Sequence, residues 1–269
     1  MLWKRIISGI LGLIILAAVV FSGSLPFFLI SLLLAGAGAI EYYRLLPFSS
    51  DDSQLLLPLL VIIMLSILYF LPAVYKFITA ALFYFLVFIY FYIINIKRHS
   101  YREMLLRVGS KLFGLLYLSG GVYALVLLRD FSYSPLEGTR AIWIVIIATW
   151  LTDTGAYFAG RAWGDKPLAP SISPNKTVAG GLGGFILSIL GFNLAAYLLG
   201  AYSLFWLMVA PVVSIAAMLG DLFISCLKRD AGVKDAGKII PGHGGILDRF
   251  DSMFFSAPAA YFIFYFLLL

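Results

Sequence analysis

The sequence predicts an all-α, polytopic integral membrane protein with about nine transmembrane helices. Of its 269 residues, 62% are hydrophobic and 12% are charged, and the mean hydropathy is +1.02. Soluble domains are roughly half apolar, so a chain of this composition must hide most of its length from water. A helix needs about 20 residues to cross a bilayer core about 30 Å thick, and windows of that length identify nine apolar stretches.

The predicted helices follow one another through short connections. The first is expected to be retained, because other spans follow it at once and it lacks a convincing small-residue cleavage site. Residues 1–108 carry few charges, mainly at span ends, and predict an N-terminal scaffold, whereas residues 109–269 hold Gly-rich helices and most of the unusual polar residues. The spans lie near residues 2–22, 25–46, 55–75, 77–96, 109–128, 141–160, 178–200, 203–227 and 251–269.

The positions of the basic residues predict the orientation. Alternate connections gather all of the 19 Lys and Arg residues on one side except Lys76, Arg129 and Arg140. The positive-inside rule places the richer side, with the N-terminus and the two large basic loops, in the cytoplasm. The net charge of +6 therefore indicates a cytoplasmic face suited to anionic headgroups or phosphates, and it does not argue for nucleic acid binding.

A first polar cluster lies in the cytoplasmic half of the sixth predicted helix. Asp153, Tyr157 and Gly160 recur at i, i+4 and i+7 and so share one helical face. Gly160 leaves room there for another backbone or a ligand. An acid within a membrane span is costly to keep, which favours a functional role for Asp153 over simple pairing with a neighbouring base.

A second cluster opens the seventh predicted helix. Lys176 and Thr177 precede a run of glycines, so a helix start offers an ammonium, a hydroxyl and backbone N–H groups to a phosphate. The spacing of a Walker A loop is absent. Gly180 and Gly184 also have the spacing of an ordinary helix-packing motif, and a plain interfacial role is the alternative for Lys176.

A third cluster runs from the eighth predicted helix to the start of the ninth. One helical face carries an acid, a hydroxyl and two cations at i, i+4, i+7 and i+8: Asp221, Ser225, Lys228 and Arg229. The following loop and helix start add Lys234, Asp235, His243, Gly244, Gly245, Asp248, Arg249 and Asp251. Asp221, Asp248 and Asp251 predict a site for Mg²⁺, which favours a few carboxylates together with waters and substrate phosphates. The alternative, a solvated loop with surface ion pairs, does not explain an acid within an apolar span.

His243 stands in a turn rich in glycine, where backbone approaches a ligand closely. No Cys or second His lies at ligand spacing, so a zinc site is not supported. A contact from His243 to a phosphate or a leaving group is preferred to a structural hydrogen bond.

The third cluster carries a resemblance to a known family. Its pattern, Ser-x-x-Lys-Arg, four residues, Lys-Asp, and then Pro-x-His-Gly-Gly-x-x-Asp-Arg-x-Asp, resembles the signature of phosphatidate cytidylyltransferases, also called CDP-diacylglycerol synthases. Every fixed position has a counterpart: Ser225, Lys228, Arg229, Lys234, Asp235, Pro241, His243, Gly244, Gly245, Asp248, Arg249 and Asp251. The segments 153–160 and 173–177 are also similar to that family's, so the resemblance covers most of the second half of the chain.

The resemblance implies that residues 109–269 form a catalytic region, which converts CTP and phosphatidic acid into CDP-diacylglycerol and pyrophosphate. It also implies a requirement for Mg²⁺, with a second cation left open. A phosphate monoester is already an anionic nucleophile, so we expect in-line attack on the α-phosphorus of CTP without a covalent enzyme intermediate, helped by neutralisation of the phosphates.

The expected roles divide the polar residues into three sets. The catalytic set is Asp221, Lys228, Arg229, Asp248 and Asp251, of which the three acids also hold the metal. The substrate-binding set is Asp153, Lys176, Thr177, Ser225, Lys234, Asp235, His243, Gly244, Gly245 and Arg249.

Two other functions remain open. A CTP-dependent polyprenol or phytol kinase shares the nucleotide and lipid chemistry, but its alcohol nucleophile needs a base. A secondary transporter also has polar residues at broken helices, but here the charges gather near one face and no inverted repeat is visible. The expected location is the cell inner (plasma) membrane, with the site facing the cytoplasm; CTP, phosphatidic acid and the bilayer are the partners, and a homodimer is left open.

Overall fold

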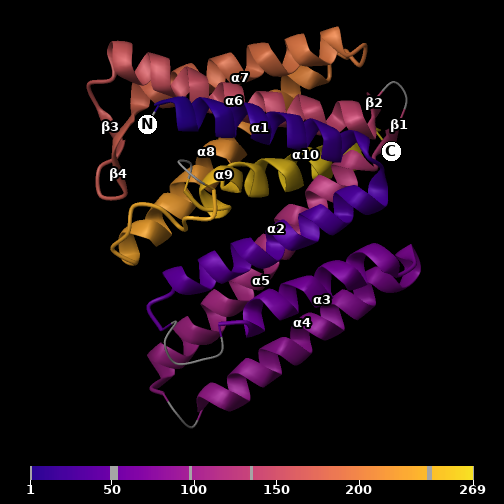
Figure 1. The fold of residues 1–269 in the computed structure, drawn as a ribbon, viewed down its shortest axis with the longest axis vertical. Helices are drawn as coiled ribbons and strands as arrows, with labels where there is room; N and C mark the ends of the chain where they lie inside the picture. Colours follow the sequence, from indigo (N-terminus) through magenta and orange to yellow (C-terminus); the bar gives the residue numbers. More distant parts are fainter. Residues whose placement is uncertain (1, 49–53, 97–98, 134–135, 241–243, 269) are drawn as a thin grey trace.

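The structure, a computed structural model, describes residues 2–48, 54–96, 99–133, 136–240 and 244–268, without the side chains of 2–8, 133, 136, 267 and 268. The described part is a bundle of helices with two small antiparallel hairpins (Figure 1). The helices are α1 (Leu2–Phe21), α2 (Ser24–Leu45), α3 (Leu56–Phe70), α4 (Ala73–Ile96), α5 (Tyr101–Arg129), α6 (Gly138–Trp163), α7 (Val178–Leu198), α8 (Trp206–Asp230), α9 (Leu247–Phe250) and α10 (Met253–Leu268). The strands are β1 (Ser132–Tyr133), β2 (Leu136–Glu137), β3 (Pro167–Ala169) and β4 (Ser173–Thr177).

The prediction of an all-α polytopic membrane protein is confirmed. Among the described residues, six helices are long and apolar enough to cross a membrane: α2, α4, α5, α6, α7 and α8. Three further apolar helices are shorter, Gly9–Phe21, Leu56–Phe70 and Met253–Phe266. Each of the nine predicted spans coincides with one of these helices, although the number that cross the membrane stays a prediction.

Helix α5 is the centre of the bundle and packs against α2, α3, α4, α6 and α10. It joins α2 at a close approach, because Gly114 lies against the ring of Tyr42 and leaves no space for a Cβ. The Tyr42 hydroxyl also donates to the carbonyl of Ser110 over 2.9 Å. Since α5 runs without a break through residue 108, the predicted division between residues 1–108 and 109–269 falls inside this helix.

Helices α6 and α7 pack backbone to backbone through glycines. A Cβ at Gly184 would stand 2.5 Å from the carbonyl oxygen of Thr152, and one at Gly155 would stand 2.6 Å from the carbonyl oxygen of Gly183. Small residues allow this approach between membrane helices. The packing role considered for Gly180 and Gly184 is therefore confirmed, and it fixes Asp153 on α6 beside the start of α7.

The two ends of the bundle differ. Figure 1 shows the N-terminus, the β3–β4 hairpin and α9 at one end, and the C-terminus with the β1–β2 hairpin at the other. Three of the predicted polar segments thus meet at one end of the molecule: the end of α6, the β3–β4 hairpin and the loop after α8.

Candidate active site

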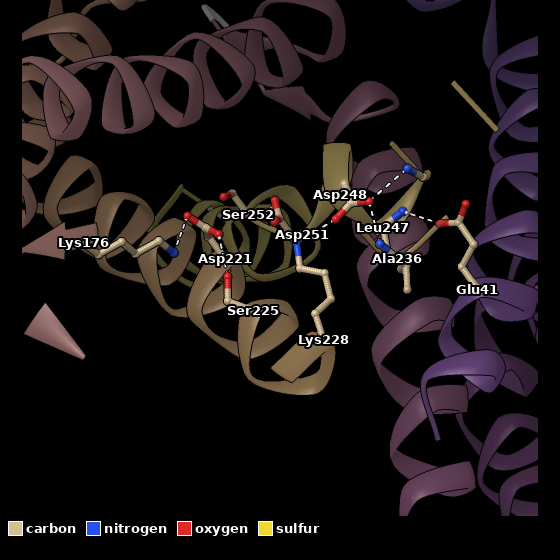
Figure 2. A network of polar contacts seen from close by, with 11 residues as sticks. Glu41, Lys176, Asp221, Ser225, Lys228, Ala236, Leu247, Asp248, Asp251 and Ser252 are labelled. Carbon is tan, nitrogen blue, oxygen red and sulfur yellow. Dashed lines mark hydrogen bonds and ion pairs between the residues drawn. The ribbon is translucent and has the colours of Figure 1, made fainter. Parts of the chain in front are cut away.

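The predicted polar face of α8 lies beside the start of α10, where Gly220 allows a close approach between the two segments. A Cβ at Gly220 would lie 2.3 Å from the carbonyl oxygen of Asp251, so only glycine admits the turn that carries Asp251. The next residue along α8 is Asp221. Figure 2 shows the side chain of Asp251 between those of Asp221 and Asp248.

The β3–β4 hairpin brings the second predicted cluster to α8. Lys176 Nζ lies 2.6 Å from Asp221 Oδ2, and Arg229 Nε donates to the carbonyl of Ile172, in the turn between the two strands, over 3.2 Å. Thr177 is the N-cap of α7, since its hydroxyl accepts the N–H of Gly180 over 3.1 Å. The hairpin is thus tied to α7 at its base and to α8 at its turn.

A second lysine–aspartate pair holds the loop after α8. Lys228 Nζ lies 2.7 Å from Asp248 Oδ1, while Asp248 Oδ2 accepts the N–H groups of Ala236 over 2.8 Å and Gly245 over 2.9 Å. Burial by itself would raise the pKa of Asp248, but the hydrogen bonds from Lys228, Gly245 and Ala236 outweigh it and hold the pKa below its usual value. The ionised side chain of Asp248 therefore holds this loop in place through its contacts with Lys228, Ala236 and Gly245.

Asp251 has the opposite electrostatic environment. Its half-buried carboxyl accepts only the N–H of Ser252, over 2.7 Å, among the described residues. Desolvation raises the pKa of Asp251 to about 7, and repulsion from Asp221 and Asp153 adds to that rise. Three acids thus repel one another here, while the Lys176 ammonium is paired with Asp221.

A cavity of about 290 Å³ opens beside these acids. Asp153, Lys176, Thr177 and Asp221 supply its polar wall, and Met218, Leu168 and Leu222 are among its apolar lining. Gly180 and Gly181 form part of the wall at the start of α7. The prediction that Asp153 and the Lys176–Thr177 pair face the same site as Asp221 agrees with this lining.

The three acids predicted to bind metal do not form one ligand group. In the part of the chain that the structure describes, no set of three or more His, Cys, Asp and Glu side chains is arranged to hold a metal ion. The carboxylates of Asp221 and Asp251 are close enough to repel each other. Asp248 is instead held by Lys228 and by two backbone N–H groups. The donor set still fits Mg²⁺, because this ion usually takes one or two protein carboxylates and completes its shell with waters and substrate phosphates.

The remaining predicted residues lie around this site with different contacts. Ser225 donates to Asp221 over a long 3.4 Å, and Lys234, Asp235 and Arg249 are exposed. Gly244 has a φ of 85°, and its backbone lies against Asp248, where a Cβ would be 2.7 Å from Oδ2. We expected the backbone at these glycines to approach a ligand closely. In the structure it instead approaches carboxylates of the protein, Asp248 at Gly244 and Glu41 at Gly245. His243 lies outside the described residues.

Glu41 of α2 is a site residue that the sequence reasoning missed. It is 1% exposed, and its Oε2 accepts the N–H of Leu247 over 2.9 Å. Gly237 and Gly245 lie so close that a Cβ on either would stand within 2.5 Å of its carboxyl oxygens. Figure 2 shows Glu41 at the opposite end of the network from Lys176. The N-terminal helices thus position the loop that carries Asp248.

Replacing Glu41 by Gln is expected to lower kcat by roughly 10- to 100-fold, because a hydrogen bond to a buried carboxylate contributes about 1.5 to 3 kcal/mol. The KM for nucleotide should change less, since Glu41 acts through the loop and not on a ligand. Limited proteolysis should cut the variant faster between residues 231 and 246. Glu103→Gln, on an exposed glutamate of α5, is the matched control. Equal kinetics and equal proteolysis of the two variants would contradict a positioning role.

The chain is similar along nearly its whole length to proteins of known activity. A family model described as the cytidylyltransferase family matches residues 3–267. Phosphatidate cytidylyltransferase from Bacillus subtilis (strain 168) is 34% identical over 271 residues, which cover 97% of this chain and 96% of that protein. Proteins of the same name are 47% identical in Staphylococcus saprophyticus, over 45% of this chain and 48% of theirs, and 38% identical in Haemophilus influenzae, over 52% and 51%.

Proposed function

The chain belongs to the cytidylyltransferase family, and we propose that it transfers the cytidylyl group of CTP to phosphatidic acid, giving CDP-diacylglycerol and pyrophosphate. One observation carries the proposal beyond the family. Two lysine–aspartate pairs, Lys176–Asp221 and Lys228–Asp248, each include one residue from the same face of α8, and the first pair lines a polar cavity. Such pairs suit a site that receives polyphosphate, because an arriving phosphate can take over the lysine from its aspartate.

The reaction needs neutralisation of charge more than activation of a nucleophile. An oxygen of the lipid phosphate forms a bond to the α-phosphorus of CTP, and the bond from that phosphorus to the bridging oxygen of the β-phosphate breaks. Pyrophosphate leaves with the electron pair. Both reactants are anions, so Lys176 and Lys228 lower the repulsion between them and stabilise the charge that develops on the leaving group.

Asp221 and Asp251 would hold Mg²⁺, and Asp153 lies close enough to add to the negative field there. Bound at this place, the ion supplies a positive charge to phosphate oxygens. Asp248 has a different part in the proposal: it holds Lys228 and the loop of residues 236–245 in position. The sequence led us to expect metal binding by all three acids, whereas we now propose metal binding by Asp221 and Asp251 and a positioning role for Asp248.

Position-specific labels in CTP test the proposed reaction. Purified protein with phosphatidic acid and Mg²⁺ should move the label of [α-³²P]CTP into the lipid and leave that of [γ-³²P]CTP in pyrophosphate. Transfer of the γ-label to a polyprenol or phytol would instead identify a lipid kinase. Transfer of neither label, with every lipid tested, would contradict the proposal.

We further propose nine membrane crossings, with the N-terminus and the site in the cytoplasm and the protein in the inner (plasma) membrane. The sixteen-to-three distribution of basic residues supports this. A homodimer stays a prediction.

Thiol labelling tests this orientation. In a Cys226→Ser background, cysteines at Ser173 or Lys238 should react with membrane-impermeant maleimide in inverted vesicles and stay unlabelled in intact cells. Gly200, in the short connection between α7 and α8, should give the opposite result when replaced by Cys. Labelling of Ser173→Cys in intact cells would reverse the orientation.

A further inference from the structure

Two apolar cavities lie beneath α1 and share one wall. One, of about 250 Å³, is bounded by α1, α2, α5, α6 and α10. The other, of about 440 Å³, lies between α1, Trp150 of α6 and the start of α10. Both are lined by Gly12 and Leu16 of α1 and by Ile240, Phe250 and Met253. The two cavities therefore adjoin along this shared wall beside residues 9–19 of α1, and together they form the apolar space considered below.

The space has a charged end that faces the candidate active site. Arg249 lines the larger cavity and not the smaller one. Its guanidinium is exposed and interacts electrostatically with Asp153, which lines the polar cavity. Asp248 precedes Arg249 directly and Asp251 follows two residues later, and both are site residues. Arg249 therefore stands between a polar cavity that suits a nucleotide and an apolar space that suits a hydrocarbon.

We propose that this space holds an acyl chain of the lipid substrate, with Arg249 binding the lipid phosphate at its polar end. The inference rests on the proposed function and deepens it. The occupant must carry an anionic headgroup, to complement Arg249, and a chain long enough to pass Gly12 into the smaller cavity. Phosphatidic acid has both features, whereas CTP has no apolar part to fill the space.

The expected benefit is positional. A chain that leaves the bilayer for an apolar protein cavity gains little hydrophobic free energy, since lipid tails are as apolar as leucine. A seated chain instead fixes the depth and direction of the phosphate relative to the nucleotide, and such orientation lowers the barrier for a bimolecular step. Shortening the cavity should therefore lower kcat/KM for long-chain substrates. It should leave kcat/KM almost unchanged for substrates whose chains end before Gly12.

The test fills the space at Gly12. A Cβ there meets no other atom within 4 Å, so Gly12→Phe places its ring in the space without a backbone clash. The kcat/KM for dioleoyl phosphatidic acid should fall roughly tenfold or more, while that for dihexanoyl phosphatidic acid and the KM for CTP stay within about twofold of the parent. Gly109→Phe is the matched control, because Gly109 of α5 also has open space around its Cβ and lines neither cavity.

A binding measurement on the parent protein keeps the inference testable should Gly12→Phe fold poorly. Phosphatidic acid with a diazirine midway along one chain should crosslink to peptides from residues 9–34, 122–125, 142–150 or 240–254, which contain the residues that line the two cavities. Dioleoyl phosphatidic acid should compete for this labelling, and dioleoyl phosphatidylcholine should not. Labelling only of other helices, or equal competition by both lipids, would overturn the inference.

The two levels of proposal fail in different ways. A parent protein that uses no phosphatidic acid of any length would contradict the proposed function itself. A parent that makes CDP-diacylglycerol, with an unchanged chain-length profile in Gly12→Phe, would contradict only the acyl-chain site.

Discussion

Replacing Asp221 by Asn is expected to lower kcat/KM by roughly 1,000-fold while the protein still inserts and purifies like the parent. Asn keeps the size of the side chain and an oxygen for Ser225, but it removes the charge that faces Lys176 at 2.6 Å. It also removes one of the two carboxylates proposed to hold Mg²⁺. Both effects act at the reacting phosphates, so turnover should suffer far more than folding.

Two measurements accompany the Asp221 variant. Lipid product from [α-³²P]CTP should be measured across a wide range of Mg²⁺, and thermal unfolding should be measured in the same detergent. Asp230→Asn, on an exposed acid at the end of the same helix, should behave like the parent in both assays. An Asp221→Asn protein with near-parent activity at saturating Mg²⁺ would remove this residue from the metal site.

The positions of the helices and the polar face of α8 could be predicted from the sequence, because both depend on local periodicity and composition. The start of α5 was missed by a hydropathy window, since Arg102, Glu103 and Arg107 lower the average in its first turns. A capping signal was available there: Ser100 stands three residues before Glu103 and accepts its N–H.

The contacts that assemble the site could not be predicted in the same way. The β3–β4 hairpin is only a few residues long and carries no strong alternation, yet it places Lys176 against Asp221. Glu41 lies on a different helix, far along the chain from Leu247, and resembles any acid near a span end until the two glycines beside it are seen. Such long-range contacts depend on packing, which a single sequence does not display.

Replacing Lys228 by Gln is expected to lower kcat/KM by roughly 30- to 1,000-fold, because a charged contact to phosphate in a shielded site is worth about 2 to 4 kcal/mol. Additional Mg²⁺ should not restore the activity, since the lost group is a hydrogen-bond donor and not a metal ligand. Lys238→Gln, on an exposed lysine of the same loop, is the matched control and should stay near the parent.

The Lys228–Asp248 pair allows its structural role to be separated from its chemical role. Both side chains are largely buried, 13% and 5% exposed, and removal of one partner from a buried pair costs about 3 to 5 kcal/mol, since it leaves the other charge unpaired. The Lys228→Gln and Asp248→Asn single variants should therefore unfold at lower temperature, and the double variant should recover part of that loss. Activity should not recover with it, because neither neutral side chain can neutralise a phosphate. If the double variant regained both stability and kcat/KM, Lys228 would serve only to hold Asp248, and its proposed contact with substrate phosphate would be wrong.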